Sequence, residues 1–352
     1  MTDFTRTDPV HVAVCGHFNH GKTTLVRTLT GRETDTLPEE KKRGTTIEPT
    51  RVPLPEAPHV HLIDVPGQRD YIRNMLATAW TADHVLLLVA ADEGVCPGTI
   101  DHLIVALFHG STVQPIITKT DLAPDHRIEQ VTHDITTLLE ELRAPTTGPP
   151  IHASPPTGEG IDEILEHLAH LEPPPRPPAD EPPRAPIENT RRLTEDTVEA
   201  TGIVDRGTLT TDEPLTLQPH DTEVTLLELE PDPAPPGHPF RAVIKTEETV
   251  NRGAVLGYDI EATDTVTARA LALNAKARPG TQIKLHALTD ARVATFTHVR
   301  TEAGTHTLRP YAEGHNVGQA TLHLDRPTVL EPGDRALATM GNEPAILLEI
   351  EG

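Results

Sequence analysis

The sequence predicts an α/β domain with a doubly wound, mostly parallel sheet, followed by two all-β barrel domains. Up to about residue 172, continuous apolar runs alternate with segments of helical periodicity. This alternation is typical of strands buried on both faces and of the helices that cover them. After about residue 187, helical periodicity is scarce, and short alternating runs punctuated by Gly and Pro indicate β-barrels.

These patterns divide the chain of 352 residues into four parts. The α/β domain is expected over 1–172. The segment 173–186 begins P-P-P-R-P-P-A-D-E-P-P, which predicts a stiff extended linker. A boundary near Thr263 divides the remainder into barrels over 187–262 and 263–352, which are ordinary sizes for small domains.

The elements of the α/β domain follow one another as strand, loop and helix. The run at 85–91 is apolar throughout, as expected of a parallel strand covered on both faces. The segment 128–142 places apolar side chains at helical spacing. We expect strands at 11–14, 60–63, 85–91 and 114–117, and helices at 24–29, 99–110, 128–142 and 161–171.

The second half is expected to consist of strands alone. Its runs alternate apolar and polar residues, which is typical of strands with one buried face. They lie at 223–229, 242–244, 268–273, 281–288, 294–299, 318–324 and 345–350.

A phosphate-binding loop opens the first domain. Residues 16–23 read G-H-F-N-H-G-K-T, which matches G-x-x-x-x-G-K-[ST], and they stand between an expected strand and an expected helix. In such a loop the backbone N–H groups surround the α- and β-phosphates, the lysine reaches the β- and γ-phosphates, and the next hydroxyl ligates Mg²⁺. The nucleotide-binding residues expected here are Asn19, His20, Gly21, Lys22, Thr23 and Thr24.

Two further signatures follow in the order that a GTP-dependent switch requires. D-V-P-G at 64–67 ends an apolar run, so Asp64 can hold the Mg²⁺ shell through water and the Gly67 amide can approach the γ-phosphate. Thr46, in the R-G-T-T-I stretch that precedes it, can ligate Mg²⁺ only while the γ-phosphate is present. The expected Mg²⁺ ligands are therefore Thr23, Thr46 and Asp64.

Base recognition is expected at T-K-T-D, residues 118–121. The Asp121 carboxylate can accept hydrogen bonds from the N1–H and the exocyclic amine of guanine, and adenine offers no such pair of donors. Thr118 and Lys119 complete this site, and the backbone amide of Ala153 can meet the guanine oxygen. Together with the phosphate loop, these residues predict an α/β P-loop GTPase domain that binds GTP and GDP.

The motifs resemble those of translational GTPases, in particular the group of elongation factor Tu and the selenocysteine-specific factor SelB. The stretch E-E-K-K-R-G and a Thr instead of an Asn at position 118 favour SelB. The resemblance is strong over most of 8–172 and thinner in the expected barrels. It rests on G-H-x-x-H-G-K-T at 16–23, E-E-K-K-R-G-x-T-I at 39–47, D-x-P-G-x-x-D-Y at 64–71, G-I-V-D-R-G-T-L at 202–209 and P-G-D at 332–334.

The resemblance implies a GTPase that binds aminoacyl-tRNA and/or the ribosome. In elongation factor Tu the aminoacyl end of tRNA lies between the GTPase domain and the second domain, and the third domain holds the tRNA arm. SelB adds a C-terminal winged-helix extension that finds an mRNA hairpin. Because the sequence stops at Gly352, we expect a SelB-like paralogue with the three core domains only, acting as a monomer.

The departures from the family pattern concern hydrolysis. The family has a His after the Pro-Gly of the second signature, and that His positions the attacking water. Here the residue is Gln68. A Gln performs this role in Ras-type GTPases, but the change puts ribosome-triggered hydrolysis in doubt. Phe18 and Thr45 also replace the family's apolar gate over the water. We expect GTP binding with slow or partner-dependent hydrolysis, and the expected catalytic residues are Gln68, Lys22 and Gly67.

Composition bears on the partners. The net charge is −23, from 53 acidic and 30 basic residues, and acidic surfaces repel RNA phosphates. A high-salt host, where the Debye length falls to about 3 Å, would make net charge a poor guide to partners. Otherwise the charge favours an alternative function, a nucleotide-dependent regulatory switch that binds a protein and turns over little GTP. A nucleotide-free structural paralogue is disfavoured, because Lys22, Thr23, Asp64 and Asp121 are all intact.

No cysteine or histidine metal site is expected. Cys15 and Cys96 are the two cysteines, they form no C-x-x-C pair, and a structural disulfide is not expected either. Most of the 20 histidines stand singly. No stretch approaches 18 apolar residues and the N-terminus has no apolar segment, which predicts a soluble cytoplasmic protein without membrane association.

Overall fold

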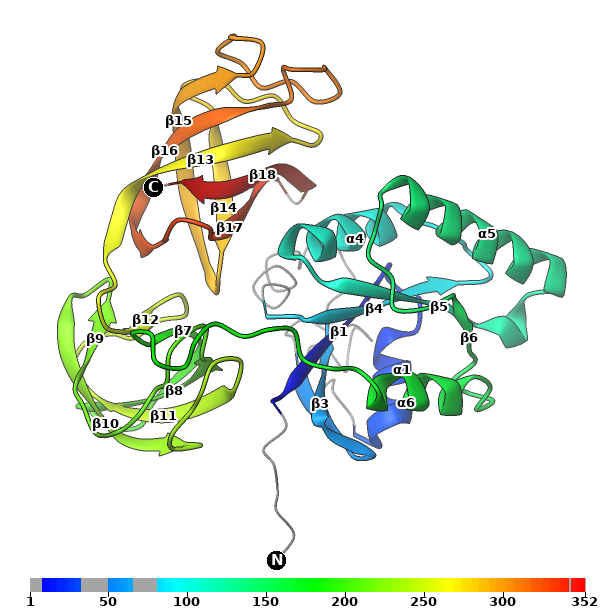
Figure 1. Ribbon diagram of the computed structural model, residues 1–352, viewed down its shortest axis with the longest axis horizontal. Coiled ribbons are helices and arrows are strands. Elements are labelled where there is room, and N and C mark those ends of the chain that lie inside the picture. The colour runs from blue at the N-terminus through cyan, green and yellow to red at the C-terminus, as the bar shows by residue number, and fades with distance from the viewer. Residues whose placement is uncertain (1–7, 33–49, 66–80, 342, 352) are drawn as a thin grey trace, which may run out of the picture. The chain divides into compact units, whose positions relative to one another are not determined.

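The computed structural model describes residues 8–32, 50–65, 81–341 and 343–351. The chain divides into two compact units, Met1–Pro174 and Pro175–Gly352 (Figure 1). The first unit contains the α/β fold, and the second contains the barrels, as the sequence predicts.

The described part of the first unit is built on one sheet, with the strand order β2-β3-β1-β4-β5-β6. Neighbouring strands are parallel except for β2 and β3, which are antiparallel. This arrangement confirms the mostly parallel, doubly wound sheet. The strands are β1 (Val10–Gly16), β2 (Thr50–Leu54), β3 (Ala57–Asp64), β4 (His84–Ala90), β5 (Thr112–Thr118) and β6 (Ile151–His152).

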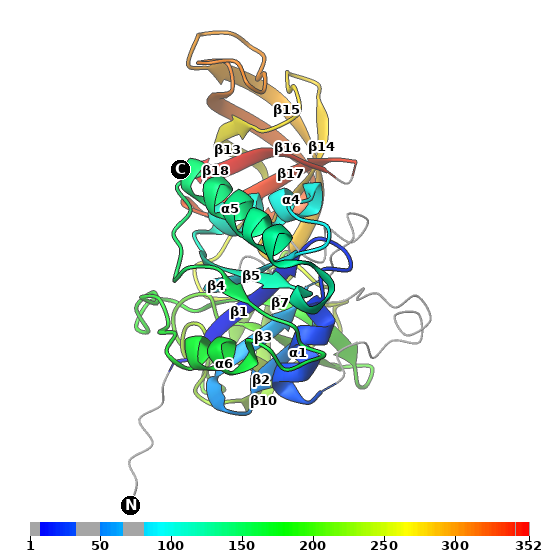
Figure 2. The same cartoon turned by 90° about the vertical axis from the view of Figure 1, so that its right-hand side faces the viewer.

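Helices cover both faces of this sheet. In the two views, α1 and α6 lie on one face and α4 and α5 on the other (Figures 1 and 2). Apolar side chains of the strands are accordingly buried on both sides, as at Leu86 and Leu87. None of the helices in the described ranges is long and apolar enough to cross a membrane. The helices are α1 (Lys22–Thr30), α4 (Pro97–His109), α5 (Asp125–Glu141), α6 (Ile161–Ala169) and the short 3₁₀ turn η2 (Thr120–Leu122).

The second unit contains two closed antiparallel barrels, which confirms the all-β expectation. The first has the strand order β10-β11-β8-β7-β12-β9, and the second has the order β13-β16-β15-β14-β17-β18. Phe240 and Phe296 are the large aromatic side chains buried in their respective cores. The strands are β7 (Arg184–Arg192), β8 (Thr197–Ile203), β9 (Leu215–Gln218), β10 (Thr222–Glu230), β11 (Pro239–Lys245), β12 (Val255–Gly257), β13 (Ala262–Ala272), β14 (Gln282–Ala287), β15 (Asp290–Thr301), β16 (Val317–Val329), β17 (Arg335–Met340) and β18 (Glu343–Glu351).

The first barrel begins earlier than the sequence suggests. Residues 184–186, expected in the linker, form the start of β7, where Arg184 pairs with Gly257 of β12. The prolines at 182 and 183 end the irregular segment immediately before the first ladder pair. We therefore propose a linker over 173–183, with barrels over 184–261 and 262–352.

A buried arginine joins the two barrels. The guanidinium of Arg184 donates to Asp205 Oδ2 at 2.6 Å within its own barrel. It also donates to Glu331 Oε2 at 3.0 Å and to both oxygens of Asp334, at 2.9 and 2.7 Å, in the β16–β17 loop of the second barrel. Arg206 donates to Glu331 as well, at 3.0 Å through Nη2. Only 6% of the Arg184 side chain is exposed, so these carboxylates compensate a charge that water cannot reach.

We expect Arg184→Met to destabilise the barrels by about 3–5 kcal/mol, because it leaves carboxylates without their buried counter-ion. Urea unfolding, monitored by hydrogen exchange of peptides from β7 and β17, measures this loss of stability separately from the unfolding of the first unit. Arg191→Met is the matched control. Its side chain is 70% exposed beside Glu199, so its loss should cost no more than about 1 kcal/mol. Equal effects of the two substitutions would contradict the role given to Arg184.

Candidate nucleotide-binding site

The loop between β1 and α1 has the backbone of a phosphate-binding turn. Its φ angles are positive at Gly16 (138°), Asn19 (62°) and Gly21 (89°). A Cβ atom at Gly16 would lie 2.4 Å from the Leu88 carbonyl oxygen of β4, so only glycine fits there. Helix α1 then starts with the Leu25 amide donating to the Gly21 carbonyl at 2.8 Å. The turn therefore ends on a helix N-terminus, which favours phosphate anions.

The Lys22 ammonium lies inside this turn. Its Nζ donates to the carbonyl oxygens of Gly16 at 2.9 Å and His17 at 2.8 Å. Burial lowers the pKa of Lys22 to about 8, while the nearby Asp64 carboxylate acts in the opposite direction. The amine stays mostly protonated at neutral pH and can attract a phosphate.

Two buried histidine rings, His20 in the loop itself and His102 on α4, lie against the backbone of this turn. The amide of Gly16 donates to Nδ1 of His102, on α4, at 3.2 Å. His20 is fully buried, and its Nδ1 lies 3.3 Å from the Ala90 amide nitrogen and 3.2 Å from the Leu88 carbonyl oxygen, so it accepts from the first or donates to the second according to its tautomer. Burial lowers the pKa of His20 to about 4 and that of His102 to about 3, so both rings are neutral and His102 Nδ1 can accept from Gly16. His102 was not among the expected residues, because no local pattern relates it to the loop.

The base motif is tied directly to the phosphate loop. The Thr118 hydroxyl, at the end of β5, donates to the His20 carbonyl at 2.8 Å, although 98 positions separate the two residues. The Lys119 Nζ lies 3.0 Å from Asp92 Oδ2 and 3.5 Å from Glu93 Oε1, in the loop after β4.

Asp121 is positioned by a contact that the sequence did not suggest. The Ser154 hydroxyl donates to Asp121 Oδ1 at 2.7 Å. The neighbouring Thr120 hydroxyl donates to Glu159 Oε2 at 2.8 Å. The only available signal for Ser154 was its place directly after Ala153.

The expectation for Ala153 is corrected by the structure. Its amide donates to the Ile117 carbonyl at 2.8 Å instead of pointing toward a base. The physical reason is the parallel pairing of β5 with β6, where Ile117 faces His152 and the ladder of hydrogen bonds continues through the next amide.

Two of the expected Mg²⁺ ligands are described. Asp64 is fully buried at the end of β3, opposite Val14 of β1. Thr23 is half-buried at the start of α1. A carboxylate and a hydroxyl beside a phosphate loop are ligands that suit Mg²⁺. Thr46, Gly67 and Gln68 lie outside the described residues.

We expect Thr118→Val to weaken GDP and GTP binding by about 1 kcal/mol, or roughly fivefold, since it leaves the His20 carbonyl without its donor while preserving side-chain shape. Thr118→Ser keeps the hydroxyl and should bind nearly as wild type. Titration with fluorescent guanine nucleotides measures both variants. Equal affinities for the valine and serine variants would show that the hydroxyl does not hold the two motifs together.

Comparisons with known proteins agree with this geometry. Residues 8–174 match the family described as the elongation factor Tu GTP binding domain. A selenocysteine-specific elongation factor of Desulfomicrobium baculatum is 39% identical over 166 residues, 46% of this chain. That of Escherichia coli (strain K12) is 38% identical over 163 residues. The matched segment makes up only 26% of either relative.

Solved structures show that the likeness also includes the barrels, where it concerns the fold alone. A bacterial selenocysteine-specific elongation factor, EF-Sec, superposes with a TM-score of 0.78 at 21% identity, covering 97% of this chain and 58% of the other. The elongation factor SelB of Methanococcus maripaludis, solved with the GTP analogue GppNHp, gives 0.80 at 19% identity, covering 98% and 79%. With the phosphate loop and base motif in place, residues 8–174 belong to the elongation factor Tu family of GTP-binding domains.

Proposed function

We propose that this protein is a SelB-like GTPase of translation that engages aminoacyl-tRNA and/or the ribosome and hydrolyses GTP slowly. The observation that carries the proposal is the hydrogen bond from Thr118 to the His20 carbonyl, because it joins the base site to the phosphate loop. A domain with both parts linked recognises the base and the phosphates of one nucleotide together.

Each binding residue has a distinct task in this proposal. Asp121 accepts the guanine N1–H and amine, and the Ser154 hydroxyl fixes the orientation of that carboxylate. Lys22 and the loop amides bind the phosphates. Thr23, Thr46 and, through water, Asp64 hold Mg²⁺. When bound, Mg²⁺ neutralises charge on the phosphate oxygens.

Slow hydrolysis is proposed from Gln68. This residue follows Gly67, whose amide contacts the γ-phosphate in the proposal, and its amide side chain orients the attacking water. A glutamine side chain can hold a water by hydrogen bonds, but it carries no ring nitrogen that titrates near neutral pH.

Partners are proposed from the relatives and from the barrels. The matching relatives are named selenocysteine-specific elongation factors, and the fold of the barrels is shared with EF-Sec and SelB structures. We therefore propose that the protein is a cytoplasmic monomer and that its partners are aminoacyl-tRNA and/or the ribosome.

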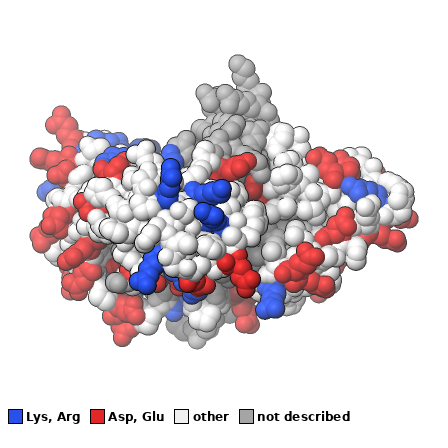
Figure 3. All heavy atoms as spheres, turned by 90° about the horizontal axis from the view of Figure 1, so that it is seen from above, with Lys and Arg blue, Asp and Glu red and all other residues white. Residues whose placement is uncertain are grey.

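The charge supports a second candidate function, a regulatory switch that binds a protein and turns over little GTP. The net charge of −23 opposes a nucleic-acid partner at low salt. On the face drawn in Figure 3, acidic side chains are spread widely, with basic side chains between them.

We expect ribosomes from the same host to accelerate single-turnover GTP hydrolysis by the wild-type protein. Gln68→His should raise the ribosome-stimulated rate further, by about 10²-fold, the lower end of what a positioned acid–base group contributes. Rapid-quench measurement of released phosphate in high-potassium buffer gives both rates.

Gln68→Ala serves as the control and should lose the stimulated rate while keeping GTP affinity. If ribosomes have no effect on wild type although GTP binds tightly, translation is the wrong process. Pull-downs with GTP- and GDP-loaded protein should then return different protein partners.

A further inference from the structure

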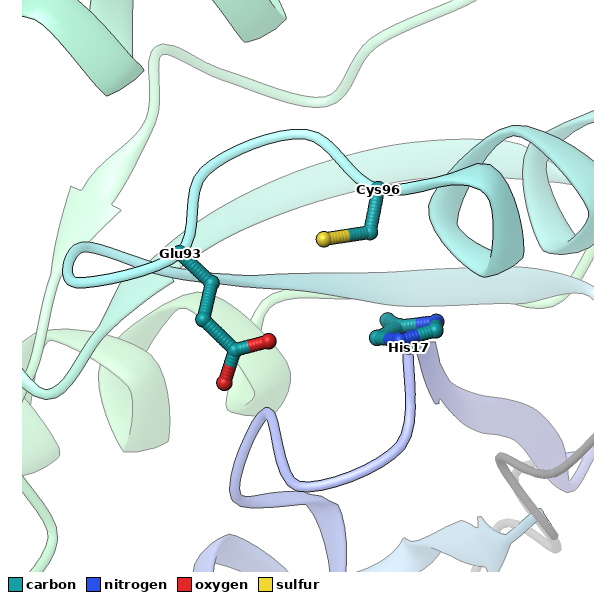
Figure 4. A group of neighbouring side chains, drawn as sticks. All are labelled: His17, Glu93 and Cys96. Carbon is teal, nitrogen blue, oxygen red and sulfur yellow. The ribbon is translucent and has the colours of Figure 1, made fainter.

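A group of metal-binding side chains lies beside the phosphate loop. One potential ligand atom from each of His17, Glu93 and Cys96 lies within 4.8 Å of the others. His17 comes from the loop between β1 and α1, and the other two come from the loop between β4 and α4. Figure 4 shows the Cys96 sulfur and the Glu93 carboxylate pointing toward the space beside the His17 ring. The His17 carbonyl accepts from Lys22 and Glu93 is paired with Lys119, but the His17 ring and the Cys96 thiol have no task in the nucleotide site described above.

The spacing is close to that of a zinc site. Around a tetrahedral Zn²⁺ ion, bound at about 2.0–2.3 Å, the ligand atoms lie roughly 3.3–3.8 Å from one another. The three atoms here lie within 4.8 Å of one another, so the largest excess over that spacing is about 1.5 Å, which rotation of the side chains can close. Thiolate, imidazole and carboxylate together suit Zn²⁺ better than Mg²⁺ or Ca²⁺, which take oxygen ligands.

Backbone hydrogen bonds hold the β4–α4 loop in place. The amides of Glu93 and Gly94 donate to the Ala90 carbonyl at 3.2 and 2.7 Å, and Arg127 Nη2 donates to the Glu93 carbonyl at 3.0 Å. Cys96 is the N-cap of α4, with its carbonyl accepting from the Thr99 amide at 2.9 Å. Two of the three ligands therefore lie on a segment whose backbone is fixed by hydrogen bonds, and one of them, Cys96, caps helix α4.

The surroundings of His17 also favour a cation. Among the described residues, its buried Nδ1 atom has no hydrogen-bond partner. A Cβ atom at position 98 would lie 2.4 Å from this nitrogen, so Gly98 leaves the room that the ring occupies. A buried ring nitrogen without a partner is costly, and that cost is removed if a metal ion binds at Nδ1.

The charges near Cys96 also suit a divalent cation. The carboxylates of Asp92 and Glu93 both lie near the Cys96 thiol. A divalent cation bound there would offset their negative charge and take the place of the thiol proton. Glu93 can bind a metal ion through Oε2. Its Oε1 is paired with Lys119 at 3.5 Å, whereas Oε2 lies farther from its neighbour, 3.8 Å from His20 Nε2.

We propose that His17, Glu93 and Cys96 bind a transition-metal ion, with Zn²⁺ as the best-suited species and one coordination position left open. The His17 carbonyl accepts a hydrogen bond from Lys22, so an ion that fixes His17 also fixes part of the phosphate loop. Metal and nucleotide are therefore coupled, and each changes the affinity for the other by the same factor.

The test uses the full chain, freed of metal with a chelator and titrated with Co²⁺ as a spectroscopic substitute for Zn²⁺. We expect one equivalent to produce a thiolate-to-cobalt charge-transfer band, and Zn²⁺ to displace it. Co²⁺ bound at the Mg²⁺ position has only oxygen ligands and gives no such band. Cys96→Ala should abolish the band, and Cys15→Ala, at the buried cysteine of β1, should retain it.

The carboxylate is tested by affinity. Glu93→Gln should weaken Zn²⁺ binding by at least about 100-fold in competition with a chromophoric chelator, more than the loss of an outer-shell group. Glu163→Gln, on the exposed surface of α6, should leave it unchanged. Circular dichroism verifies that each variant is folded. No charge-transfer band in wild type, or an undiminished band in Cys96→Ala, would overturn the proposal, as would equal Zn²⁺ affinities of the two glutamine variants.

Discussion

The first unit is organised around one buried charge, the Lys22 ammonium. Removing an ammonium from water is costly, and here the cost is offset by two loop carbonyls and the Asp64 carboxylate. Those carbonyls point inward only because the turn takes left-handed backbone angles, and Gly16 fits only because it lacks a Cβ beside β4. The order of the strands, the glycine positions and the buried aspartate together hold this ammonium inside the turn, where it can attract a phosphate anion.

The segments that follow the sheet strands are connected to one another by hydrogen bonds to the phosphate-binding turn. The base motif is attached to it by Thr118, and helix α4 supports it through His102. The loop after β4 contacts both sides, through Lys119 on the base side and through the His17 group on the phosphate side. A change at one of these contacts is expected to alter the shape of the turn, because Gly16 and His20 each form hydrogen bonds with other segments of the chain.

Local patterns in the sequence predicted what depends on neighbours in the chain. The glycine spacing, the strand and helix around Lys22 and the alternation in the barrels are of this kind, and the structure confirms those elements. Contacts between distant segments escaped prediction: the Ser154–Asp121 bond, the support from His102, and the pairing that turned the Ala153 amide away. The absence of a C-x-x-C pair argued against a thiolate metal site, yet Cys96 meets His17 only after folding. Roles assigned to Gln68, Gly67 and Thr46 remain predictions.

The Arg184 cluster has a mechanical consequence. Asp205 on one barrel and Asp334 on the other share its guanidinium, and both barrels fall within a single compact unit. Sliding one barrel past the other would expose a buried cation or leave carboxylates facing each other, which is a steep energetic barrier. The two barrels are therefore expected to turn together, as one body.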